Sequence, residues 1–458
     1  MAAETQRSEL RRYRSWALAS GFADGVRDAK FMELIQQLER GTYHSAPPIT
    51  LLVDGAHAFD AVLKDLATAQ EEILLETYIL RDDRIGTQVQ TALIAAAKRG
   101  VRVAVLADAL GSAATAESFW ETLEAEGVIV RRFHRFWHMP FDALHRDHRK
   151  IIVIDRTAAF TGGMNIGEEY GSSIRAHSDG GWRDTFMRIE GSVALELAAV
   201  FAEGWDRAKG PPLPGLEYVS WSDGIVVPPL GTVQALGAQA LRARIKRRLG
   251  LHHDHNRGRR VKRVQETPSE QRSDGDRAVL VLDSRPGRGQ REIIATVAAL
   301  VGGARKRLWI TTPYFAPPTG ALQLLMRSAR RGVDVRLLLP GPKTDVPLAR
   351  HAAHGAYSVL LENGVRLFEY QAATLHSKTV VVDGFASVIG SSNLDFRSLW
   401  LNAECNLLLF DDVCAAELEQ AFLVDLKGSI EITTADWSKR TISHRIHDLI
   451  ARGLRAAL

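Results

Sequence analysis

The chain has 458 residues, and its 58 lysines and arginines exceed its 54 aspartates and glutamates by four. This length corresponds to two or three domains. With 46% hydrophobic and 24% charged residues, the composition excludes wholesale disorder, a coiled coil and a collagen-like repeat. The two cysteines, Cys405 and Cys414, are too few for a disulfide framework and fit a reducing compartment.

The N-terminal residues predict neither a signal peptide nor a membrane span. Three arginines between residues 11 and 14 precede an apolar stretch, but two nearby glutamates and the shortness of the stretch argue against a signal peptide. The longest uncharged stretch, residues 224–241, is interrupted by two prolines and three glycines. A membrane-spanning helix needs about 20 mostly apolar residues. We therefore expect a protein that is soluble or bound to a membrane surface.

The first domain begins with a helix and a strand and then repeats that order. A helical face of apolar residues between 59 and 66 precedes the strand-like residues 73–80. Residues 95–108 (AAAKRGVRVAVLAD) then show a basic helix end, a glycine stop and a short apolar strand. The second domain repeats this order: residues 292–307 predict a helix and 308–315 a strand, and 327–340 (RSARRGVDVRLLLP) match 95–108. Two copies of an α/β unit, with helices covering a sheet, are predicted.

Two basic segments fall outside this repeat. Residues 242–263 hold ten lysines and arginines and one acid, and the polar, turn-rich residues 265–277 indicate a linker. In residues 439–458 apolar side chains recur every three or four positions among basic ones, which predicts an amphipathic helix. Both segments suit an anionic surface, either lipid or nucleic acid; a solvated basic face and an ordinary docking helix are the alternatives.

We accordingly divide the chain into five segments. They are an N-terminal helical extension (1–48), the first domain (49–223), an uncharged stretch with the basic segment and linker (224–277), the second domain (278–428) and a C-terminal amphipathic basic helix (429–458).

One pattern of polar residues occurs twice with identical spacing. His148, Lys150, Asp155 and Asn165 recur as His376, Lys378, Asp383 and Asn393, so that His to Lys is 2, His to Asp 7 and His to Asn 17 residues in both copies. Each Asn closes a short glycine-containing segment, Gly162–Asn165 or Gly390–Asn393. Two such matches are very improbable by chance, so the repeat carries function.

The spacing has a physical reason. Residues 148–155 (HRKIIVID) and 376–383 (HSKTVVVD) are each predicted to form a buried strand, in which side chains alternate between faces. His and Lys, two apart, therefore project to one side, and the glycine-containing segment returns the Asn towards them. Asp155 and Asp383 belong to the catalytic pattern, but their odd offset predicts that they point away and fix a turn.

This set of groups suits phosphodiester chemistry. A neutral imidazole attacks phosphorus while the opposite imidazolium protonates the leaving oxygen. Lysines and asparagines stabilise the non-bridging oxygens as charge develops, so that neither a metal nor a cofactor is expected. A metal at His145 and His148 is disfavoured, because their odd offset on a strand separates them.

The paired HxKxxxxDxxxxxxG(G/S)xN pattern resembles the phospholipase D superfamily. That resemblance covers about residues 51–425 and implies two tandem α-β-α sandwich domains, packed as a pseudo-two-fold dimer around one site. The stretches WRDTF, ITTPYF, GSSNLDFRS and LNAE are similar to the bacterial cardiolipin synthase branch. In that family's pattern, Asp184 orients His148 and Glu404 orients His376. The alternative for both acids is an ordinary surface ion pair.

This chain departs from the family in two ways. Gly163 stands where many members carry serine, so Ser391 is the expected hydroxyl near phosphate. The two N-terminal spans of the membrane-embedded synthases are also missing, so we expect the shorter, peripheral type, which uses 242–263 and the C-terminal helix to reach lipid.

The resemblance implies a phosphatidyltransferase at the cytoplasmic face of the cell membrane. His148 is expected to attack one phosphatidylglycerol and His376 to protonate the released glycerol. A second phosphatidylglycerol then takes the phosphatidyl group to give cardiolipin. A hydrolase that releases phosphatidic acid, a metal-independent endonuclease and a non-enzymatic membrane-binding protein are the alternatives. The expected partner is an anionic phospholipid surface rather than nucleic acid, and the sequence leaves the oligomeric state open.

Overall fold

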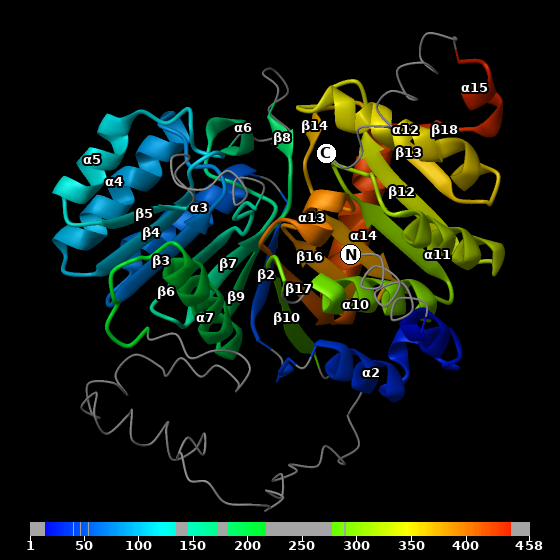
Figure 1. Ribbon diagram of the computed structural model, residues 1–458, viewed down its shortest axis with the longest axis horizontal. Helices are drawn as coiled ribbons and strands as arrows, with labels where there is room; N and C mark the ends of the chain where they lie inside the picture. The colour runs from blue at the N-terminus through cyan, green and yellow to red at the C-terminus, as the bar shows by residue number, and fades with distance from the viewer. Residues whose placement is uncertain are drawn as a thin grey trace, which may run out of the picture.

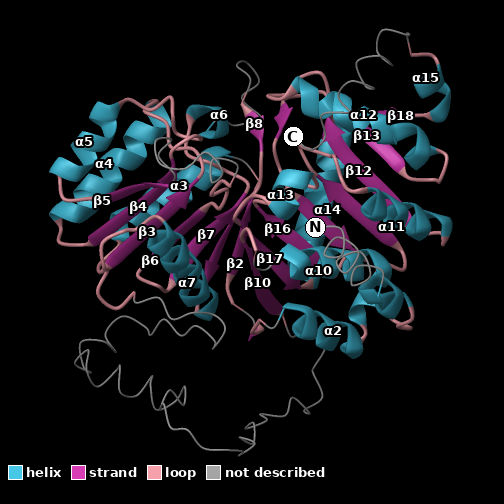
Figure 2. Ribbon diagram, in the orientation of Figure 1, coloured by secondary structure: helices cyan, strands magenta, loops and turns pink. Residues whose placement is uncertain are grey.

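The computed structural model describes residues 14–39, 41–45, 47–53, 55–133, 145–171, 181–216, 277–287 and 290–440. Two α/β halves lie side by side, each built on a twisted sheet with helices packed against it (Figures 1 and 2). The predicted α/β class with two repeated domains is confirmed.

The first half contains a seven-stranded sheet. Its helices are α3 (Gly55–Thr68), α4 (Arg84–Lys98), α5 (Glu117–Ala125), α6 (Glu168–Gly171) and α7 (Ser192–Arg207). In spatial order the strands are β2 (Ile49–Leu52), β9 (Phe186–Glu190), β7 (Ala158–Gly162), β6 (Ile151–Ile154), β3 (Glu72–Thr77), β4 (Arg102–Asp108) and β5 (Ile129–Phe133).

The second half contains a nine-stranded sheet. Its helices are α10 (Gln290–Gly303), α11 (Thr319–Arg330), α12 (Pro347–Leu361), α13 (Phe396–Trp400) and α14 (Asp412–Lys427). In spatial order the strands are β1 (His44–Ser45), β10 (Ala278–Ser284), β17 (Glu404–Phe410), β16 (Ala386–Gly390), β15 (Thr379–Val382), β11 (Arg307–Thr311), β12 (Asp334–Pro340), β13 (Arg366–Tyr370) and β18 (Ser429–Ile432).

The same order and direction of strands occurs in both sheets. The run β2-β9-β7-β6-β3-β4-β5 corresponds to β10-β17-β16-β15-β11-β12-β13, with the last three strands parallel and the others antiparallel in each. Gly100 and Gly332 follow α4 and α11 with φ near +90°, a conformation that glycine adopts without a steric penalty. The repeat seen in the sequence is therefore a repeat of topology.

The two sheets share a hydrophobic core. Residues of α7 pack between strands of both halves, in one cluster that includes Val153, Met187, Val281 and Leu407. Cys405 and Cys414 are buried in this cluster, where burial raises the pKa of both thiols, so they pack as small hydrophobic groups. The contact fixes the orientation of one half against the other, which positions everything that lies between them.

Two of the predicted segments differ from the structure at their ends. The extension predicted as helical contains α2 (Ala29–Glu39), but its residues 44–45 form β1, which pairs with β10 of the second sheet. The segment predicted as a C-terminal helix begins as strand β18, because Ser429–Ile432 completes the sheet beside β13; helix α15 (Thr434–Ser438) follows. Residues 224–276 and 441–458 lie outside the described residues.

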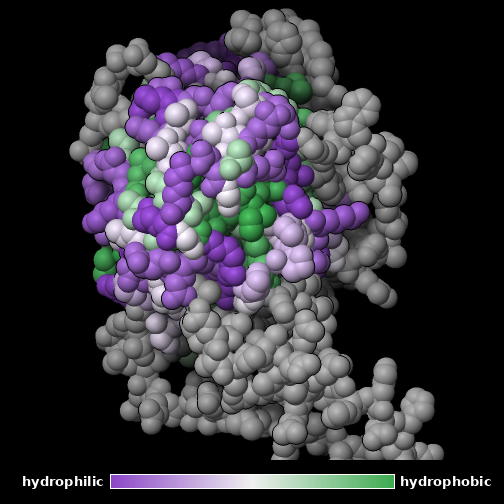
Figure 3. Space-filling view, turned by 90° about the vertical axis from the view of Figure 1, so that its left-hand side faces the viewer, coloured by the Kyte–Doolittle hydropathy of each residue, from purple (hydrophilic) through white to green (hydrophobic). Residues whose placement is uncertain are grey.

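Among the described residues, no helix has the length and apolar character needed to cross a membrane. The end of the molecule that carries α4 and α5 has a mostly hydrophilic surface, with hydrophobic residues near its middle (Figure 3). The hydrophilic surface is consistent with the amphipathic character of α4, whose apolar residues Ile85, Val89 and Leu93 are buried.

Candidate active site

The two repeated histidines lie at the contact between the halves, each just before a central strand. The His148 N–H donates to the carbonyl oxygen of Ala403 (2.9 Å), and the His376 N–H donates to that of Arg183 (2.8 Å). Beside His376, β14 (Thr374–Leu375) and β8 (Trp182–Arg183) form a two-stranded parallel ladder (Figure 1). The halves are thus joined by backbone pairing directly beside each histidine.

The carboxylates that orient the histidines are exchanged between the halves. Nδ1 of His148 lies 3.0 Å from Glu404 Oε2, and Nδ1 of His376 lies 2.6 Å from Asp184 Oδ2. The expected assignment, Asp184 to His148 and Glu404 to His376, is therefore wrong. The residue before each acid, Ala403 or Arg183, pairs with the histidine-bearing segment of the other half, which brings the carboxylate to the opposite imidazole.

Burial sets the protonation of both imidazoles. It lowers the pKa of His148 to about 4, although the Glu404 carboxylate opposes this shift. The pKa of His376 is lowered as well, by burial and then by the Lys378 ammonium, against the effect of Asp184. These shifts favour the neutral form of both rings at neutral pH. A carboxylate at Nδ1 favours the proton there and leaves a lone pair on Nε2.

Each lysine contacts the histidine of its own motif. Lys150 Nζ donates to the carbonyl oxygen of His148 (2.7 Å), and Lys378 Nζ lies 2.8 Å from Nδ1 and 3.2 Å from Nε2 of His376. Both are buried, and burial lowers the pKa of Lys150 to about 7 and that of Lys378 to about 8. Each ammonium places positive charge next to an imidazole.

A cavity of about 370 Å³ opens between the halves and is lined by both histidines. Its wall also holds Asn165 and Asn393, two arginines and several aromatic rings. The Trp182 and Tyr170 ring centroids lie 5.1 and 5.4 Å from that of His376, and that of Tyr78 lies 5.0 Å from His148. This volume is in the range of small-molecule sites.

The two asparagines differ in their contacts. Asn165 accepts from the Ile79 N–H (3.2 Å) and donates to the Tyr170 hydroxyl (2.7 Å). Asn393 also lines the cavity, and its Oδ1 has no hydrogen-bond partner among the described residues. Their predicted role at phosphate stays a prediction.

Ser391 does not face the cavity. Its hydroxyl donates to the Glu404 carboxylate and accepts from the Cys405 N–H (3.0 Å), so it steadies the partner of His148 instead of a phosphate. At the equivalent Gly163, a Cβ would lie 2.1 Å from Asp184 Oδ1. The glycine therefore leaves room for the shorter acid, and the expected role of Ser391 at phosphate is corrected.

Asp155 and Asp383 lie at the far ends of β6 and β15 from the lysines. Both have φ near +50°, in the left-handed region. Asp155 accepts the backbone N–H groups of residues 70–72, and Asp383 those of residues 305–307, at 2.7–2.9 Å. Their place in the catalytic pattern is thus structural: each ties a turn to the start of the neighbouring strand.

One functional residue was missed by the sequence reasoning. Arg149 stands between His148 and Lys150, and its fully buried guanidinium contacts Glu203 (2.9 Å) and Asp283 (2.5 Å). Asp283 belongs to the second half, so this ion pair bridges the halves behind the site. Alternation along the strand was the available signal, since a residue between His and Lys projects to the opposite face.

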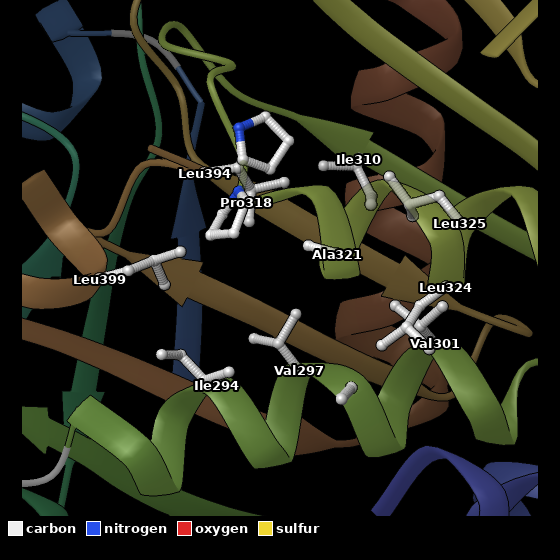
Figure 4. A pocket seen from close by; sticks show the side chains of 12 residues that line it. Ile294, Val297, Val301, Ile310, Pro318, Ala321, Leu324, Leu325, Leu394 and Leu399 are labelled. Carbon is white, nitrogen blue, oxygen red and sulfur yellow. The ribbon is translucent and has the colours of Figure 1, made fainter. Parts of the chain in front are cut away.

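A second pocket, of about 50 Å³, lies between α10, α11 and the 394–399 segment (Figure 4). The side chains drawn there are all apolar, including Ile294, Val297, Leu324 and Leu394. Asn393 and Asp395 line the larger cavity while Leu394 lines this pocket, so the two spaces lie on opposite sides of one strand-like segment. A pocket lined only by apolar side chains offers no groups that could bind or activate a phosphate.

In the part of the chain that the structure describes, no group of three or more His, Cys, Asp or Glu side chains is arranged to hold a metal ion. The larger cavity is lined by imidazole, amide and guanidinium groups, together with aromatic rings and carboxylates.

Comparisons with known proteins identify the family. Residues 62–173 and 297–426 match the family described as "Cardiolipin synthase, PLD-like domain". Cardiolipin synthase 1 of Bacillus cereus is 32% identical over 429 residues, which cover 93% of this chain and 75% of the relative. Cardiolipin synthase 2 of the same organism is 34% identical over 397 residues, covering 86% and 68%.

Two solved structures share the fold. Phosphatidylserine synthase of Haemophilus influenzae Rd KW20 matches with a TM-score of 0.66 at 15% identity, covering 94% of this chain and 100% of that chain. Polyphosphate kinase of Porphyromonas gingivalis matches with a TM-score of 0.51 at 13% identity, covering 94% and 56%. At these identities the likeness concerns the fold, whereas the sequence matches establish the family. The chain belongs to the cardiolipin synthase family of phospholipase D-like phosphatidyltransferases.

Proposed function

We propose that this chain transfers a phosphatidyl group from one phosphatidylglycerol to another and releases glycerol. The observation that carries the proposal is the exchanged pair of histidine–carboxylate contacts at a single cavity. Two imidazoles, each oriented at Nδ1, present two Nε2 atoms to one site, as a two-step displacement at phosphorus requires. The names of the relatives support the lipid substrate.

In the first step, Nε2 of one neutral imidazole bonds to phosphorus as the bond from phosphorus to the glycerol oxygen breaks. The opposite imidazolium donates its proton to that oxygen, and glycerol leaves. A bound phosphate anion raises the pKa of a nearby imidazole, which favours the protonated partner that this step needs. The resemblance assigns the attack to His148 and the proton to His376.

In the second step, the now neutral opposite imidazole takes the proton of a hydroxyl on the second phosphatidylglycerol. The oxygen bonds to phosphorus as the phosphorus–nitrogen bond breaks, which gives cardiolipin and restores the first imidazole. Lys150 and Lys378 provide positive charge next to the rings, and Asn165 and Asn393 donate to the non-bridging oxygens. Two phosphatidylglycerols thus yield one cardiolipin and one glycerol.

We place the reaction at the cytoplasmic face of the cell membrane, with the protein bound peripherally to anionic lipid. The segments expected to make that contact, 242–263 and 439–458, lie outside the described residues except for 439–440. Their contribution to membrane binding stays a prediction. Each basic residue near an anionic membrane surface is expected to contribute about 1 kcal/mol of binding free energy.

The proposal is tested by removing either histidine and measuring turnover of phosphatidylglycerol vesicles. His148→Ala and His376→Ala are each expected to lower turnover by at least about 1,000-fold, since either step needs both rings. His57→Ala, at an exposed position of α3, is the control and retains wild-type turnover. A His376→Ala enzyme with near-normal turnover contradicts the two-histidine scheme.

A further inference from the structure

The product of the proposed reaction carries two phosphodiesters, whereas the repeated motifs account for one. In the proposed reaction the donor phosphorus binds between His148 and His376, whose cavity is also lined by the asparagines of the motifs. The acceptor phosphatidylglycerol brings a second phosphate, which remains intact throughout the reaction. A site that joins the two lipids must hold this second anion close to the first.

Two guanidinium groups line the same cavity outside the repeated pattern. Arg146 comes from the first half and Arg397 from α13 of the second. At the equivalent positions of the other copy stand Thr374 and Glu169. The two arginines therefore break the pseudo-two-fold symmetry and add positive charge to one side of the cavity only.

The two arginines converge on the His148 side. The carbonyl oxygen of Arg146 accepts from the Ala403 N–H (2.8 Å), and that of Arg397 accepts from the Asn402 N–H (2.9 Å). Because residues 402 and 403 are consecutive, one short segment holds both arginines. Burial raises the pKa of Tyr78, whose ring packs against His148, and both guanidinium groups oppose that rise.

Two acids lie near these arginines. Asp108 Oδ1 lies 3.6 Å from Arg146, and Asp395 lines the cavity next to Arg397. Burial raises the pKa of Asp108 to about 6 and that of Asp395 to about 7, so at neutral pH Asp108 remains mostly ionised beside Arg146 while Asp395 is only partly ionised. The His376 side is instead walled by Trp182, Tyr170 and Tyr314, together with Asp345.

Asn402 gives an independent sign that a ligand belongs here. Its Nδ2 points to Glu404 Oε1 (3.4 Å), while its buried Oδ1 has no hydrogen-bond partner among the described residues. A buried amide oxygen without a donor is costly. The glycerol that links the two phosphates keeps a free hydroxyl, which is a suitable donor.

We propose that Arg146 and Arg397 form a second anion subsite that binds the phosphodiester of the acceptor lipid, with Asn402 accepting from its glycerol hydroxyl. Guanidinium groups bind phosphate oxygens through charge-assisted, often bidentate, hydrogen bonds. The subsite favours an acceptor that carries its own phosphate over water or a simple alcohol. It rests on the proposed function, since it names how the same site chooses its acceptor.

The test compares two reactions of one enzyme. Incorporation of labelled glycerol into phosphatidylglycerol requires one phosphate in the site, whereas cardiolipin formation requires two. Both are measured on phosphatidylglycerol vesicles for wild type, Arg397→Gln, Arg397→Lys and the control Arg84→Gln. Arg84 is exposed and pairs with Glu168 outside the cavity lining. Arg397 is the primary target, because Arg146 is almost fully buried and its replacement risks misfolding.

Arg397→Gln is expected to lower the ratio of cardiolipin formation to glycerol exchange by about 10- to 100-fold, the effect of losing a hydrogen bond to a charged group. The loss appears as a raised KM for phosphatidylglycerol as acceptor. Arg397→Lys restores part of the ratio, and Arg84→Gln leaves it unchanged. A parallel fall of both reactions, or an unchanged ratio, overturns the subsite. A wild-type enzyme that performs neither reaction contradicts the proposed function itself.

Discussion

His148 and Glu404 are 256 residues apart in the chain, and their side chains meet at 3.0 Å. With the reciprocal contact between His376 and Asp184, this means that neither half contains an oriented histidine of its own. The site is complete only when the halves are docked. The shared core around α7 and the Arg149–Asp283 ion pair hold that docking in place.

The exchanged pairing predicts which histidine responds to each acid. Glu404→Gln removes the carboxylate that opposes the fall in the pKa of His148, so the pKa of His148 drops further while that of His376 stays in place. Turnover falls by about 10²- to 10⁴-fold, as for the loss of an orienting carboxylate elsewhere. Titration of the imidazole resonances by NMR checks this. A shift confined to His376 contradicts the assignment.

The pH dependence of kcat/KM follows from the pKa values of the histidines and lysines in the free enzyme. As pH falls towards 4, His148 gains a proton on Nε2 and loses the ability to attack. As pH rises through about 7 to 8, Lys150 and Lys378 lose their ammonium charge. A bell-shaped profile between these limits is expected. The Lys378 ammonium lowers the pKa of Lys150, so the Lys378→Met substitution raises that pKa. The alkaline limb of the variant's residual activity therefore shifts to higher pH. An alkaline limb above pH 10 in wild type argues against buried lysines in this role.

Asp155 and Asp383 are expected to affect stability far more than chemistry. Asp155→Asn weakens three backbone contacts at the turn after β6 and lowers the free energy of unfolding by about 1–3 kcal/mol. The folded variant keeps kcat within about threefold of wild type, as does Asp383→Asn. Denaturant unfolding and steady-state kinetics on the same samples separate the two effects. A loss of kcat comparable to that of the histidine variants shows that the aspartate acts in the reaction.

Gly163 and Ser391 occupy equivalent positions but are not interchangeable. Gly163→Ser places a Cβ against the Asp184 carboxylate and displaces it from His376, so turnover falls by about 10-fold or more. Ser391→Ala removes one hydrogen bond from Glu404 and costs less, about 2- to 10-fold. Turnover rates of the two purified variants test this order. An active Gly163→Ser enzyme with wild-type kcat shows that Asp184 does not need its present position.

The repeat made much of this protein predictable from its sequence. Identical spacing from His148 to Asn165 and from His376 to Asn393 implies two equivalent strands and turns, because side-chain alternation and the glycine segments act within a few residues. The α/β class followed from the same local periodicity. What failed depends on contacts between distant segments. The exchange of Asp184 and Glu404 arises from backbone pairing across the halves, and β1 and β18 form because distant strands leave sheet edges to be paired.

The central claim is tested most directly with purified protein and vesicles of phosphatidylglycerol labelled in the glycerol headgroup, with EDTA present, by following lipid products and released glycerol together. We predict cardiolipin and free glycerol in equal amounts. Phosphatidic acid in place of cardiolipin contradicts the transferase assignment and indicates a hydrolase, and the absence of any turnover contradicts phosphatidylglycerol as the donor.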